Sequence, residues 1–164
     1  MGYLIDYEVE QSSANFLPRI RNITHISFPW LYNKEKLLLW HRFIAIFEPH
    51  FRDVKEIDSF YFELLLESAK KWHKQSPKRV AIEAFTKVLE YEGRLHNLNR
   101  CVICNQKIEN SVSLINKFLP THSSCSNLEP INLKKVEYLF NKKSSIYLED
   151  NEIDKLIGLV YKGF

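Results

Sequence analysis

The chain has 164 residues, enough for one ordinary domain or two small ones. Its composition, 45% apolar and 26% charged, is globular and excludes a disordered tail, and its apolar runs fall far short of the ~20 residues that span a bilayer. The start of the sequence lacks signal-peptide features, and three cysteines in a reducing compartment argue against a disulfide framework. We therefore expect a cytoplasmic protein without a membrane partner.

The N-terminal segment reads as extended chain. Polar and apolar residues alternate over residues 2–10, which predicts a half-buried strand with its apolar side chains on one face. A polar turn is expected at residues 11–15, and a second extended stretch at residues 17–28, where Pro18 and Pro29 disfavour a helix. Because two strands do not make a stable sheet, this segment is expected to be only part of a β-unit.

Three helices that pack as a bundle are expected next, because apolar residues recur at helical spacing between capping signals. Their expected limits are Asn33 to Pro49, Asp53 to Gln75 with Ile57 in the apolar stripe, and Ser76-Pro77 to Gly93. Two more helices are expected near the end of the chain, starting at Pro130 or Asn132 and at Asp150 or Asn151. The predicted fold class is α+β, mainly α.

The net charge of +3 is small, but the segment Lys70–Arg79 holds five basic residues and no acidic one. A local basic patch can bind a polyanion even when the whole molecule is nearly neutral. Lysine is also favoured at a helix C-terminus by the helix dipole, so a solvated helix end is an equally open interpretation. Trp72 lies inside this segment, where it can stack on a base or belong to the core; its spacing from Leu65 favours the core.

A metal motif carries the clearest chemistry. Cys101-Val-Ile-Cys104 is followed, after seventeen residues, by His122-Ser-Ser-Cys125. Two short pairs at this separation are the usual signature of a tetrahedral zinc site, and the intervening chain is expected to form a hairpin with its turn at Asn110–Ser111. Four protein ligands leave no position for water, so we predict one structural Zn2+ per chain.

Other interpretations of these residues are weaker. A lone CxxC can be a redox pair or simply buried thiols, but a redox pair needs a strand–CxxC–helix setting. Among the other histidines, His96 alone lies close enough to Cys101 to substitute as a ligand. No HExxH, Walker A, GxSxG or GxGxxG motif is present, so we assign no catalytic residue and expect a binding protein rather than an enzyme.

The order of features resembles the bacterial recombination mediator family RecO. The helix beginning Arg79-Val-Ala-Ile-Glu and ending at Gly93 fits that family's pattern before its CxxC, and Arg100-Cys101-Val-Ile-Cys104 follows at the right distance. The stretches 15–21 and 35–39 are similar to the family's link between an OB-fold and a helical domain. The chain departs from the family because the first OB-fold strands have no counterpart. It also carries Asn105 in place of a glycine, lacks the Gly-Gly before the second metal pair, and has His122 in place of a cysteine.

The resemblance implies a fold and a function. It implies a partial OB-fold-like β region at residues 1–30 and a helical domain at residues 31–164, with a zinc knuckle at residues 98–128. RecO proteins bind single- and double-stranded DNA, anneal complementary strands and load recombinase onto DNA coated with single-strand-binding protein. They act with RecR and contact the C-terminal tail of that binding protein, so nucleoid association is implied. Candidate DNA contacts are Arg19, Arg21, Lys70, Lys71, Lys74, Lys78 and Arg79. The alternative is a zinc-stapled interaction module that binds an acidic peptide tail without binding DNA.

Overall fold

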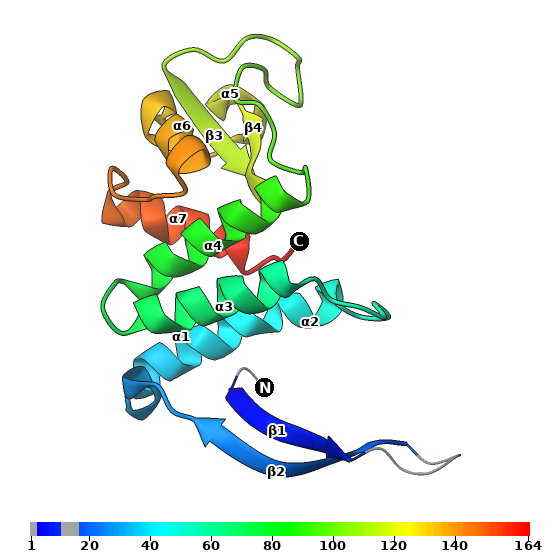
Figure 1. Cartoon of the computed structure of the whole chain (residues 1–164). Coiled ribbons are helices and arrows are strands. Elements are labelled where there is room, and N and C mark those ends of the chain that lie inside the picture. Colours follow the sequence, from blue (N-terminus) through cyan, green and yellow to red (C-terminus); the bar gives the residue numbers. More distant parts are fainter. Residues whose placement is uncertain (1–2, 11–16) are drawn as a thin grey trace.

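The computed structural model describes residues 3–10 and 17–164 (Figure 1). The turn expected at residues 11–15 lies outside the described residues. The strands are β1 (Leu4–Glu10), β2 (Arg19–Ile26), β3 (Ser111–Ile115), β4 (Leu119–Thr121) and β5 (Ile131–Asn132). The helices are α1 (Lys34–Ala45), α2 (Phe47–His50), α3 (Ser59–Trp72), α4 (Pro77–Tyr91), α5 (Ser123–Ser126), α6 (Leu133–Lys142) and α7 (Asp150–Val160), with short 3-10 turns η1 (Pro29–Tyr32) and η2 (Asn116–Phe118). This confirms the expected α+β class with mainly helical content.

The two N-terminal strands form an antiparallel hairpin beside the helices (Figure 1). The register shifts near Asn22, whose φ is +52°, as in a β-bulge. The strands were expected, but their expected half burial is wrong: every residue of β2 and all but one of β1 are exposed. The hairpin contacts α1 next to the first residue of β1, where the centroid of the Tyr3 ring lies 6.0 Å from that of the His41 ring. No other strand among the described residues pairs with this hairpin, because β4, β3 and β5 form a separate sheet.

The hairpin therefore presents an apolar face to solvent. Paired residues of an antiparallel ladder lie on one face, so the pairs Ile5–His25 and Val9–Ile20 define that face. Its exposed large side chains are Tyr3, Ile5, Tyr7, Val9, Ile20 and Ile23.

The start of α1 follows the capping chemistry that the sequence predicts, and the start of α3 does not. Asn33 caps α1 as expected, accepting the N–H of Lys36 at 3.0 Å. The expected cap at Asp53 is wrong, because α3 is capped by Asp58, whose carboxylate accepts the N–H of Phe60 at 2.8 Å. Asp53 lies in a turn after α2 with a φ of +65°, and α3 begins only at Ser59, so Ile57 lies outside the helix and is exposed. The first helix also ends earlier than Pro49, which falls inside the separate short helix α2.

A tryptophan cluster fills the core between α1 and α3. Trp30, Trp40 and Trp72 lie within 6.5 Å of one another by ring centroids. The indole of Trp72 is fully buried and donates to the carbonyl of Lys36 at 3.0 Å, and Trp30 donates to the carbonyl of Ala69 at 2.7 Å. Trp72 is therefore a core residue, and its ring offers no free face to a base.

Helix α4 runs through the centre of the core and ends as the sequence indicates. Proline occupies its first turn, although Ser76 makes no side-chain capping bond. Gly93 has a φ of +67°, and its N–H bonds to Glu90 O at 2.9 Å while Arg94 N–H bonds to Leu89 O at 2.7 Å. This pair of bonds is the Schellman motif, which turns the chain out of the helix toward the metal motif.

The C-terminal helices close the other side of the core. Asn132 caps α6, which decides between the two starts that were open. The expected cap of α7 at Asp150 or Asn151 is wrong, because Glu149 caps it in a capping box with Glu152. Buried residues of the metal region and of all the long helices belong to one hydrophobic cluster. No helix of the described segments is both long and apolar enough to cross a membrane.

A half-buried carboxylate joins three helices and gives a pH-dependent prediction. Glu92 at the end of α4 accepts hydrogen bonds from Tyr61 and His50 at 2.6 Å each and from Arg94 at 2.8 Å. Burial raises the pKa of the Glu92 carboxyl, but the hydrogen bonds from Tyr61 and Arg94 and the charge of His50 outweigh it and hold that pKa below its ordinary value. A lowered folded-state pKa contributes stability above the unfolded-state value of about 4.3, and that stability is lost as the pH falls through the folded-state pKa.

We therefore expect Glu92→Gln to lower the free energy of unfolding by about 1–3 kcal/mol at pH 7, with the difference from wild type shrinking below about pH 4. Urea denaturation at several pH values measures this. Glu63→Gln, an exposed carboxylate on α3, is the matched control and should change little. A Glu92→Gln penalty that is constant from pH 7 to pH 3 would contradict the ionic origin.

Candidate functional site

The first pair of candidate metal ligands, Cys101 and Cys104, lies on a tight loop between α4 and β3. Cys101 N–H bonds to Gln106 O at 2.9 Å, and Asn105 N–H bonds back to Cys101 O at 2.9 Å. Asn105 has a φ of +58°, a backbone conformation that asparagine tolerates better than most residues, so it holds the turn without a glycine. The loop therefore brings the side chains of Cys101 and Cys104 to one side.

The second pair lies at the start of a short helix. His122 is the N-cap of α5, and Cys125 follows one turn later, with its N–H bonded to His122 O at 3.0 Å. Val102 N–H bonds to Pro120 O at 2.9 Å, which ties the first loop to β4, the strand that leads into α5.

The intervening chain is a hairpin as expected, but its turn lies elsewhere. The predicted turn at Asn110–Ser111 is wrong, because β3 begins at Ser111 and the chain reverses at η2. There Lys117 and Phe118 have φ values of +60° and +58°. The shift has a packing reason: β3 pairs with both β4 and β5 and buries Val112 and Leu114 in the core.

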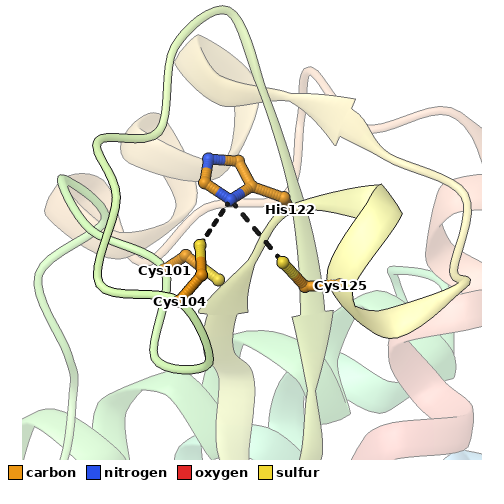
Figure 2. Close-up of side chains that lie close together, drawn as sticks. All are labelled: Cys101, Cys104, His122 and Cys125. Atoms are coloured by element: carbon orange, nitrogen blue, oxygen red, sulfur yellow. Dashed lines mark hydrogen bonds between the residues drawn. The ribbon is translucent and has the colours of Figure 1, made fainter.

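Figure 2 shows the four side chains pointing toward one another. Their ligand atoms all lie within 4.8 Å of one another. The Nδ1 atom of His122 is 3.3 Å from Sγ of Cys104 and 3.9 Å from Sγ of Cys125. Metal bonds of about 2.3 Å to sulfur and 2.0 Å to nitrogen make the sulfur–nitrogen edge of a tetrahedron about 3.5 Å long. The arrangement fits one four-coordinate metal ion, and the four expected ligand residues are the ones that meet.

The surroundings prepare His122 as a ligand. Its Nε2 lies 3.0 Å from the carbonyl oxygen of Lys107, which can only accept. Nε2 therefore carries a proton, and in the neutral ring the lone pair of Nδ1 points at the thiols. A backbone or carboxylate acceptor behind a histidine is the usual outer partner of a metal ligand, because it sets the tautomer and the ring orientation.

The Cys101 sulfur lies in a pocket of backbone donors. Burial raises the pKa of its thiol, but N–H groups of Cys104, His122 and Ile103 lower it to about 6. Thiolate is the form that binds metal, so the backbone favours the ligating state. His96 is exposed and takes no part in the cluster, so it does not replace His122.

The basic residues at the junction of α3 and α4 fall into two groups. Lys71 pairs with Glu67 at 2.6 Å and Lys78 with Asp154 at 2.6 Å, whereas Lys70 and Lys74 are exposed and make no ion pair with any residue that the structure describes.

Arg79 serves to connect elements. Its guanidinium donates to the carbonyls of Ser145 at 2.5 Å and Leu148 at 2.9 Å, and to the carboxylate of Asp150 at 2.9 Å. These bonds fasten the start of α4 to the segment between α6 and α7, a role that the sequence pattern did not reveal.

The arginines of the hairpin lie opposite its apolar face. The register pairs Arg21 with Glu8 and Arg19 with Glu10, and Arg21 also forms an ion pair with Glu10 at 2.6 Å. Asp6 shares this face, so three carboxylates there outnumber the two arginines. The hairpin therefore carries no net basic patch.

Sequence reasoning missed Lys87, Lys142 and Lys143, which the fold brings near Lys71 and Arg79 around one groove. One signal was available for Lys87, which follows Arg79 by two helical turns on α4. Nothing in the sequence indicated that the face of α4 with Arg79 and Lys87 would lie next to the end of α6.

Comparison with known proteins adds one finding. A family model described as RecO N terminal matches residues 1–31, which cover the hairpin and the start of η1. No curated protein matches the chain. The N-terminal part of the chain is thus similar to the N-terminal region of a DNA repair and recombination family.

Proposed function

We propose that Cys101, Cys104, His122 and Cys125 bind one zinc ion with a structural role. Three thiols and one imidazole are the donor set that zinc prefers, and the ligand-atom spacing suits its tetrahedral geometry. Four protein ligands leave no open position for water or substrate, so the protein acts by binding and not as an enzyme. The ion would hold the loop after α4 against β4 and α5.

We further propose that the protein is a recombination and repair mediator of the RecO kind. The observation that carries this is the match of residues 1–31 to the RecO N-terminal family model. The order of helix, CxxC loop and second metal pair supports it. In this role the protein binds single- and double-stranded DNA, promotes annealing, and helps to load recombinase on DNA coated with single-strand-binding protein, with RecR as a partner.

Charge reversal at the exposed lysines tests DNA binding. Neither Lys70 nor Lys74 pairs with a described residue, so Lys70→Glu/Lys74→Glu should leave the fold intact. We expect it to weaken binding of a fluorescent oligothymidylate about tenfold or more at low salt and to reduce the salt slope of log K by about 1–2. Fluorescence anisotropy over a salt series measures both quantities.

The matched control is Lys55→Glu/Lys162→Glu, which changes the net charge equally at exposed sites away from the α3–α4 junction. If both double variants bind like wild type, the lysines are not DNA contacts. If wild-type protein fails to bind the bare oligonucleotide at any salt concentration, the DNA-binding function itself is wrong.

An interaction module is the second candidate, and a cavity favours it. A hollow of about 350 Å³ lies between the sheet of the metal region and α7. Leu114, Ile131, Leu156 and Leu159 line it, together with the charged pair Lys155 and Glu129. Apolar walls suit an apolar side chain of the acidic peptide tail that the resemblance implies, and Lys155 could meet the tail's carboxylates only by leaving Glu129, which also lines the hollow and pairs with it. Binding of such a peptide, together with no binding of bare oligonucleotide, would favour this candidate over the first.

A further inference from the structure

A second hollow, of about 540 Å³, lies between α4 and the end of α6, within the size range of ligand sites. One wall is the face of α4 that carries Arg79, Glu83 and Lys87, extended by Lys71 at the end of α3. The other wall is the segment 142–146. We call this hollow the α4–α6 groove.

Hydrogen bonds and an ion pair connect the two walls of the groove. Ser145 is almost fully buried, and its N–H and hydroxyl both donate to Glu83 at 2.8 Å, while Arg79 donates to its carbonyl. Lys143 on the second wall pairs with Glu90 of α4 at 2.6 Å. A groove fixed in this way is present before any ligand arrives, so little ordering is needed on binding.

The groove carries excess positive charge at its mouth. Lys71 and Lys87 share the single carboxylate of Glu67, at 2.6 and 2.8 Å, so one positive charge of that pair stays unbalanced. Lys142 is exposed and has no ion-pair partner among the described residues. Exposed lysine–glutamate pairs contribute little to stability, so these ammonium groups are free to turn toward a phosphate.

An exposed aromatic residue, Tyr147, directly follows Ile146, the last residue that lines the groove. Tyr147 is 59% exposed, and its ring packs edge-to-face on Tyr138 at 4.6 Å, which holds the ring in place. Tyr138 precedes Lys142 by one helical turn on α6, so the two share a face of that helix. An exposed ring at the end of the groove wall and the ammonium groups along that wall can contact a base and the phosphates next to it, respectively.

We propose that the α4–α6 groove binds single-stranded polynucleotide, with Lys71, Lys87 and Lys142 along the phosphates and Tyr147 stacked on a base. This inference rests on the proposed DNA-binding function and locates one site for it. Stacking requires an unpaired base, because the bases of a duplex are already stacked on one another. The groove therefore distinguishes single strands from duplex, whereas the lysines alone do not.

The test compares a fluorescent oligothymidylate with a duplex of equal length, by anisotropy. Tyr147→Ala should weaken single-strand binding about tenfold and leave duplex binding unchanged, and Tyr147→Phe, which keeps the ring, should bind like wild type. Lys142→Glu should weaken binding of both. Phe62→Ala, which removes a ring of similar exposure on α3, is the control and should change neither affinity. Circular dichroism checks that each variant is folded.

Each result has a distinct meaning. Absence of single-strand binding by the wild type would refute the proposed function. Wild-type binding that Tyr147→Ala leaves unchanged, or that weakens equally for single strand and duplex, would overturn the groove assignment while DNA binding stands. If an oligoglutamate peptide binds and Tyr147→Ala weakens that peptide instead of DNA, the groove is an acidic-peptide site and the assignment is likewise overturned.

Discussion

Replacing Cys101 with serine is expected to abolish metal binding and to lower the free energy of unfolding by on the order of 5 kcal/mol. The reason is that structural zinc contributes roughly 10–16 kcal/mol of apparent binding energy in small metal modules, and a three-ligand site keeps only part of it. Cys101 is buried at the centre of its loop, so no other side chain can take its place. Elemental analysis should find one zinc per wild-type chain and close to none in the variant.

The stability loss has an internal check. If it arises from the metal, chelator-treated wild type and Cys101→Ser should unfold at the same urea concentration. Ser124→Ala, an exposed change within α5, is the matched control and should keep both zinc and stability. A wild-type protein that is stable without any bound metal would contradict the zinc assignment.

The loss should also be local. Hydrogen exchange should accelerate at residues 98–130, while α1, α3 and α4 keep their protection. The hairpin β3–β4 packs on the core by contacts that do not involve the metal, because the Phe118 ring is fully buried and its centroid lies 5.1 Å from that of Phe85 in α4. Global unfolding on chelation would show that this contact is not sufficient.

The second large effect is expected at Trp72. Trp72→Ala should lower the free energy of unfolding by about 3–5 kcal/mol, because it empties a fully buried site and leaves the carbonyl of Lys36 without its indole donor. Urea denaturation measures the change. Phe62→Ala, at a ring that is 57% exposed, is the control and should cost far less.

The same variant separates core packing from base stacking. Where Trp72→Ala is still folded, at low temperature, its affinity for oligothymidylate should equal that of wild type. A small stability loss combined with a large loss of affinity would instead show that the ring contacts DNA. If the affinity is unchanged, DNA contacts of the segment Lys70–Arg79 are left to its basic side chains, among which Lys70 and Lys74 are exposed and make no ion pair with a described residue.

Local chemistry was readable from the sequence alone. Asn33 and Asn132 cap helices, Gly93 ends one, and the spacing of Cys101 and Cys104 bends the chain around one point. Each of these depends on atoms a few residues apart, so backbone geometry and the side chain's own hydrogen bonds determine the outcome. The metal quartet was also readable, because a second short pair at a suitable distance needs only one hairpin to reach the first.

Where distant segments meet was decided only by the tertiary structure. The turn of the metal hairpin lies at η2 because β3 is buried between two partner strands. The apolar face of the N-terminal hairpin is exposed because no described element packs over it. The sequence predicted Arg79 as an exposed cation that could contact DNA. In the structure its guanidinium donates to three acceptors that lie 66 to 71 residues away in the chain. The α4–α6 groove likewise joins Lys71 and Lys142, whose meeting depends on how α4, α6 and α7 pack. Packing of this kind sums many weak contacts between remote residues, and no short pattern in the chain encodes that sum.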